Sequence, residues 1–198
     1  MSAVSETIVR EYFELHGFLI RQHRKYVAPN RKEQDDQVDF FVCNPHPQPR
    51  PDELPFVLGS AELLCIEKAI VVVKGWHTET FSLARLTSAP KIFRFVQPKA
   101  FQQAMRAFGT DGTPLKILVV PALPREAEAH RQSIELLRSK GVDAVIPFRT
   151  MLSDLVNNTE SNRNYQKSDL LQIIRILKSY DLLRDPQLEL FRGRRKRV

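Results

Sequence analysis

The sequence contains few cysteines and no long apolar run. Its two cysteines, Cys43 and Cys65, lack a CxxC spacing and have no cluster of other metal ligands around them. Such usage favours a reduced, intracellular protein over a disulfide framework or a zinc site. No apolar run approaches the roughly 18 residues of a membrane helix, and the N-terminal stretch is too charged for a secretory signal. We therefore expect a cytoplasmic protein without membrane contact.

Glycine-rich phosphate loops are also missing. Neither GxGxxG nor GxxxxGK[ST] occurs in the 198 residues, so nucleotide-binding loops of those types are not indicated. The composition, with 42% hydrophobic and 27% charged residues, is that of a soluble globular chain. Its length is enough for one domain with a substantial core and a small extension.

Positive charge is concentrated at the C-terminal end. The formal net charge is +7, but five of the 30 basic residues lie in 192–198, which leaves 25 basic against 23 acidic residues elsewhere. The five are Arg192, Arg194, Arg195, Lys196 and Arg197. A second basic cluster, 21–32, includes Tyr26. Two basic regions in a balanced chain favour a polyanion such as DNA, bound partly through counterion release. A solubilising or targeting tail is the alternative.

Hydrophobic periodicity predicts alternating helices and strands. The predicted helices are 5–16, 60–69, 82–95, 98–108, 125–141, 151–158 and 168–183, and the predicted strands are 18–27, 36–45, 70–76, 115–123 and 142–148. The later strands are continuous Val, Ile and Leu runs, which are typical of a sheet covered by helices on both faces. We expect an α/β domain over 1–157, a helical extension over 158–184, and a terminal peptide and basic tail over 185–198.

Polar residues interrupt or end the apolar strands at two places. Asp39 is the acidic exception in the strand QVDFFV, and the strand IVVVKGW ends in Lys74. The first helix adds Glu6, Glu11 and Glu14. A helix carboxylate, a strand aspartate and a strand lysine that meet at one sheet edge could cleave phosphodiesters. The carboxylates would hold Mg²⁺ or Mn²⁺, and the lysine would neutralise developing negative charge.

At these residues the chain resembles the PD-(D/E)xK nuclease superfamily, the restriction-endonuclease-like fold. The resemblance covers the helix with Glu6, the GFLI strand entry, VDFFV with Asp39, and VVVKGW with Lys74. It implies a central mixed sheet flanked by helices. It also implies that Asp39 is the metal-binding acid, that Lys74 is the catalytic lysine, and that Glu6 joins them.

The sequence departs from that family at the acidic position of the (D/E)xK element, which is Val72. Valine cannot ligate a metal. Either another acid substitutes, with Glu79, Glu67 and Glu62 as candidates, or the site has lost catalysis. The chain would then be a DNA-binding or partner-binding module of the same fold.

Simpler interpretations of the same residues stay open. Lys74 could be a solvated strand end, and Asp39 could pair with an arginine or with Lys74 in a plain α/β scaffold. Trp76 suits packing better than base stacking, and His77 suits a polar loop better than a general base.

The peptide Gln187–Phe191, QLELF, resembles the motif that bacterial partners insert into the DNA sliding clamp. Gln187, Leu188, Leu190 and Phe191 match that pattern, and Glu189 takes the Ser/Asp position. Leu190 and Phe191 would fill an apolar pocket while Gln187 hydrogen-bonds at its edge. The alternative is that the three apolar residues dock onto the last helix. In a eukaryote the basic tail would instead read as a nuclear-import signal.

Together these features predict a bacterial, nucleoid-associated protein of DNA repair, replication-linked processing or defence. It would hydrolyse DNA with Mg²⁺ if Asp39, Lys74, Glu6 and a substitute such as Glu79 form a working site. Otherwise it would bind DNA or the clamp without cutting. The oligomeric state is left open.

Overall fold

The structure is a computed structural model of the whole chain, and it describes residues 3–22, 38–98, 101–102, 105, 108 and 112–183. The chain divides into two compact units, Met1–Asp154 and Leu155–Val198. The first unit contains the sheet and its covering helices. The second contains the end of α6 (Phe148–Asn158) and α7 (Asp169–Ser179). Among the described residues, no helix combines the length and the apolar character needed to cross a bilayer.

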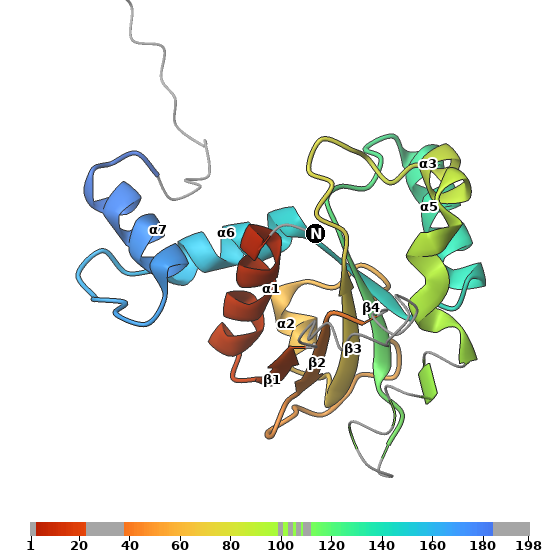
Figure 1. Cartoon of the computed structure of the whole chain (residues 1–198), viewed down its shortest axis with the longest axis horizontal. Helices are drawn as coiled ribbons and strands as arrows, with labels where there is room; N and C mark the ends of the chain where they lie inside the picture. Colours follow the sequence, from red (N-terminus) through yellow and green to blue (C-terminus); the bar gives the residue numbers. More distant parts are fainter. Residues whose placement is uncertain are drawn as a thin grey trace, which may run out of the picture. The chain divides into compact units, whose positions relative to one another are not determined.

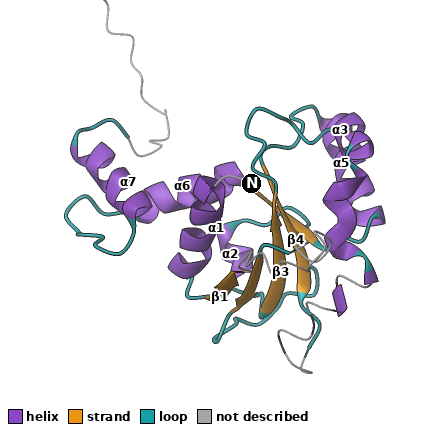
Figure 2. Cartoon of the chain, viewed as in Figure 1, coloured by secondary structure: helices purple, strands orange, loops and turns teal. Residues whose placement is uncertain are grey.

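A five-stranded mixed sheet forms the centre of the first unit (Figure 2). The strands lie in chain order and are β1 (Leu19–Gln22), β2 (Phe40–Cys43), β3 (Lys68–Val73), β4 (Leu115–Val120) and β5 (Ala144–Pro147). β2 runs antiparallel to its two neighbours, β1 and β3, whereas β3, β4 and β5 are parallel. The carboxyl ends of β1, β3, β4 and β5 therefore meet the amino end of β2 at one end of the sheet.

One face of the sheet is covered by α3 (Leu83–Ser88), the 3-10 helix η1 (Pro90–Val96) and α5 (Ala127–Ser139) (Figure 1). Side chains alternate along a strand, so Ile70 and Val72 of β3 point to this face together. They pack in one buried layer with Leu118 of β4, Leu86 of α3 and Leu137 of α5. Alternate residues of β3 are therefore buried in this apolar layer.

The opposite face is covered by α1 (Ala3–Leu15) and the short α2 (Ser60–Leu63) (Figure 1). The buried residues of α1 recur at helical spacing, which gives the apolar stripe that packs on the sheet. The four apolar members are Ile8, Val9, Tyr12 and Phe13. This packing brings the first turn of α1 to the end of the sheet where β3 terminates.

The predicted α/β class with a mixed sheet flanked by helices is confirmed. The strand expected over 18–27 is seen as the four-residue β1, and residues 23–37 lie outside the described part. The mostly helical segment predicted over 82–95 is divided into α3 and η1 at the predicted break near Pro90, because proline cannot continue the hydrogen bonds of α3. In the second unit, Ser168 caps α7 as predicted, and its Oγ accepts from Leu171 N at 3.2 Å.

Candidate functional site

Asp39 and Lys74 lie at the same end of the sheet, as the sequence predicts. Lys74 follows the last residue of β3, and its backbone N–H donates to Val119 O of β4 at 3.0 Å. Asp39 precedes β2, and its N–H donates to Val71 O at 3.1 Å. The Asp39 carboxylate then accepts the N–H of Val73 at 2.7 Å. A side-chain oxygen thus takes the place of a backbone carbonyl where β2 and β3 separate.

Glu6 reaches the same end from the first turn of α1. Its carboxylate accepts a hydrogen bond from Nε2 of Gln22, the last residue of β1, at 2.6 Å. The register pairs Gln22 with Phe40, which is the neighbour of Asp39 in the chain. A carboxylate in the first turn is also favoured by the helix dipole. We call this set, Glu6, Gln22, Asp39 and Lys74, the polar end of the sheet.

The start of α1 is pressed against the loop after Lys74. A Cβ added to Gly75 would lie 3.0 Å from Ser5 Cβ, so only glycine leaves room for the helix. The buried Ser5 also shares a 3.1 Å hydrogen bond, from its Oγ, with Nε2 of His77. The His77 ring in turn meets Phe148 edge-on, with the ring centroids 4.6 Å apart. His77 therefore contacts both α1 and the start of α6.

The residues at the polar end do not fit the metal site that the resemblance implies. Val72, at the acidic position, is 2% exposed and belongs to the apolar layer with Leu118. Each candidate acid has a structural partner: Asp39 bonds Val73, and Glu6 bonds Gln22. No group of three or more His, Cys, Asp and Glu side chains within the described ranges is arranged to hold a metal ion.

The proposed substitute acids are engaged elsewhere. Glu79 follows β3 closely, but it forms an ion pair with Arg85 of α3 and accepts its Nη2–H at 2.9 Å. Glu67 lies just before the amino end of β3, about 23 Å from Lys74 at 3.3 Å per strand residue, and pairs with Lys68 at 3.3 Å. Glu62 accepts the N–H of Gly59 in the capping box of α2. The distance between Glu67 and Lys74 therefore excludes Glu67 as the substitute acid.

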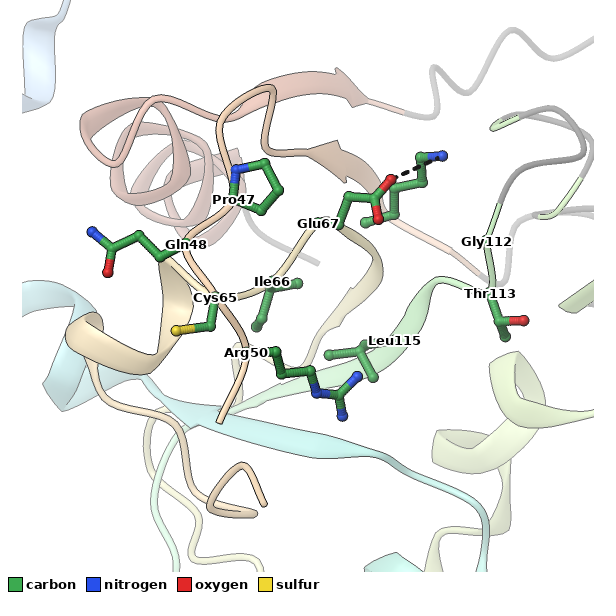
Figure 3. Close-up of a pocket in the computed structure, with 10 residues that line it drawn as sticks. Pro47, Gln48, Arg50, Cys65, Ile66, Glu67, Gly112, Thr113 and Leu115 are labelled. Carbon is green, nitrogen blue, oxygen red and sulfur yellow. Dashed lines mark ion pairs between the residues drawn. The ribbon is translucent and has the colours of Figure 1, made fainter. Parts of the chain in front are cut away.

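A separate cavity of about 240 Å³ opens at the opposite end of the sheet. Figure 3 shows Arg50, Cys65 and Thr113 around it, with the Glu67–Lys68 ion pair at its rim. Because the length of β3 separates this cavity from Lys74, the two sites cannot hold one small ligand. The cavity also combines both signs of charge, which gives no preference for an anion.

The structure adds contacts that the sequence did not suggest. The Ser5–His77 bond joins residues 72 positions apart, and the Arg85 guanidinium lies 4.7 Å above the Trp76 ring. Gly75, two residues after the end of β3, is the local signal of a close approach there. The predicted clamp-binding residues 187–191 and the basic residues of 192–197 lie outside the described residues.

Comparison with known proteins identifies no relative of this chain. No family model matches the chain, and neither the curated proteins nor the solved structures contain a significant match.

Proposed function

We propose that this chain binds DNA through a restriction-endonuclease-like core and that the core does not hydrolyse it. One observation carries the proposal: Lys74 follows β3 directly after Val73, whose N–H the Asp39 carboxylate accepts, while Val72 is buried in the apolar layer. The lysine needed to meet a phosphate is present at the end of the sheet. Among the described residues, no group of three or more His, Cys, Asp and Glu side chains is arranged to hold a catalytic metal.

Binding and hydrolysis make different demands on this site. A phosphate contact needs a cation and open access, whereas metal-assisted hydrolysis needs carboxylates with oxygens directed at the ion. At the polar end, the carboxylates of Asp39 and Glu6 instead hold Val73 and Gln22 in place. These contacts stabilise the end of the sheet and keep Lys74 in position. The order of one helix, three antiparallel strands and a parallel fourth strand also suits the resemblance.

The C-terminal segment belongs to the same proposal. The basic residues of 192–197 would add phosphate contacts, and residues 187–191 would join the protein to a sliding clamp. A DNA-binding core attached to a clamp would act in repair, replication-linked processing or defence. Association with the nucleoid follows from this arrangement.

The test is the DNA affinity of Lys74→Ala, measured by anisotropy of labelled DNA at several salt concentrations. We expect weaker binding and a decrease of about 1 in the salt slope, because one phosphate contact is lost. Lys91→Ala, which removes an exposed lysine of η1, is the matched control and should change neither quantity. An unchanged slope in Lys74→Ala would contradict the proposed role of Lys74.

A second measurement separates binding from hydrolysis. Wild type and Asp39→Asn are incubated with single-stranded, duplex, flapped and branched DNA in Mg²⁺ and in Mn²⁺. We expect no cleavage by either protein. Cleavage by the wild type that disappears in a folded Asp39→Asn variant would establish hydrolysis. It would also mean that another acid, such as Glu79 or one outside the described residues, takes the role missing at Val72.

A further inference from the structure

The loop after Lys74 carries an exposed aromatic residue at a defined place. Trp76 is the single tryptophan of the chain, and it lies two residues beyond Lys74. It is 37% exposed, although it is the largest apolar side chain in the sequence. Isolated exposed apolar residues are common on protein surfaces. Trp76 differs from such residues in the side chains that contact its ring.

Two side chains contact the indole. The ring centroid of Phe81, which is fully buried, lies 5.7 Å from that of Trp76, with an angle of 54° between the ring planes. The Arg85 guanidinium lies 4.7 Å from the ring centroid. Arg85 is fixed in turn by the Glu79 carboxylate. The flat surfaces of Trp76 and Arg85 are thus positioned before any ligand arrives.

The backbone of this loop is also tied down. Glu79 N–H donates to Trp76 O at 2.9 Å, which closes a tight turn, and Phe81 N–H donates to Ala122 O at 2.8 Å. Ser82 then caps α3 by accepting the N–H of Arg85 at 3.3 Å. A preformed surface loses little conformational entropy when a ligand binds.

We propose that Trp76 and Arg85 form a stacking platform for an unpaired nucleotide, so that the partner of this end of the sheet is single-stranded DNA. The inference rests on the proposed DNA binding and names its substrate class. Indole rings and guanidinium planes both stack on nucleobases, and every base offers a π face. Bases inside a duplex are covered by their neighbours, so a platform of this kind selects unpaired ones. Lys74, two residues away, meets the adjoining phosphate.

The single tryptophan makes the experiment specific. Wild-type protein is titrated with a (dT)20 oligonucleotide and with a blunt 20-base-pair duplex, and tryptophan fluorescence is followed alongside anisotropy of the labelled DNA. We expect (dT)20 to quench the fluorescence strongly and the duplex to quench it little. Trp76→Ala should weaken (dT)20 binding by roughly 5- to 150-fold, the loss typical of one stacked base. The ratio of single-strand to duplex affinity should fall accordingly.

Two further variants serve as controls. Leu152→Ala removes another apolar side chain that is 37% exposed, and it should leave the (dT)20 affinity unchanged. Trp76→Phe keeps an aromatic ring, so it should retain part of the preference for (dT)20 over the duplex. This variant tests the platform if Trp76→Ala does not fold. Equal (dT)20 affinity in wild type and folded Trp76 variants, with DNA binding intact, would overturn the platform but not the proposed function. Absence of DNA binding by the wild type would overturn both.

Discussion

Asp39 Oδ2 accepts the backbone N–H of Val73 at 2.7 Å, so the acid at the polar end closes the ladder between β2 and β3. The same carboxylate is the residue that the nuclease resemblance assigns to metal binding. Loss of function in an Asp39 variant therefore has two possible causes, a missing functional group or a loosened sheet end. Stability must be measured before any activity is interpreted.

Asp39→Ala should lower the free energy of unfolding by about 1–3 kcal/mol, because the N–H of Val73 loses its acceptor. Asp39→Asn keeps a carbonyl oxygen at the same place and should cost less. Urea denaturation measures both values. Asp52→Ala removes an exposed acid from the loop between β2 and α2 and should change stability by no more than about 0.5 kcal/mol. Equal stability of Asp39→Ala and wild type would show that the hydrogen bond is not structural.

Gly75→Ala should destabilise the protein by about 1–3 kcal/mol, because the new Cβ would press on Ser5 and displace the start of α1. The Ser5→Gly background removes the opposing side chain, so the same substitution should cost less there. A double-mutant cycle in urea gives the coupling between the two positions. Additive effects would mean that α1 moves aside without cost.

Tyr12 should make stability fall at alkaline pH. Burial raises the pKa of Tyr12 from 10.0 to about 12, with the hydrogen bond to Ser60 acting in the opposite direction. The unfolded chain releases this proton near pH 10 and the folded protein near pH 12. The folded state therefore holds the extra proton, and stability declines between these values by at most about 1.4 kcal/mol per pH unit.

Tyr12→Phe should remove that part of the decline. Below pH 10 the variant should be less stable by about 1 kcal/mol, because the 3.1 Å hydrogen bond between Tyr12 and Ser60 is lost. Denaturation at pH 8 to 11.5 provides the measurement. Tyr180→Phe is the control, since Tyr180 is 74% exposed. Parallel pH profiles for wild type and Tyr12→Phe would refute the burial effect.

The clamp motif is tested by replacing its two apolar anchors. Leu190→Ala combined with Phe191→Ala should reduce affinity for a purified bacterial sliding clamp at least tenfold, because two buried anchors are lost. Calorimetry or surface binding gives the affinity. Leu182→Ala removes an exposed leucine shortly before the motif and should bind like wild type. Unchanged binding by the double variant would leave the motif without a role.

Local sequence patterns predict most of the helices and strands and the apolar layers of this protein. The Val, Ile and Leu runs of β3, β4 and β5 predict buried strands because continuous burial on both faces needs no polar alternation. Ser168 marks the start of α7 because its hydroxyl accepts a free N–H of the first turn. The position of Lys74 at a strand end is also predicted locally, because the apolar run stops at Val73.

The contacts of the polar residues, in contrast, depend on how the chain packs. Asp39 and Val73 are 34 positions apart, and Ser5 and His77 are 72 apart, so their contacts depend on strand register and helix packing. The pairing of Glu79 with Arg85 likewise depends on where α3 begins. A sequence pattern specifies which residue types occur at a strand end. The packed chain decides whether a carboxylate holds an N–H, a guanidinium or a ligand.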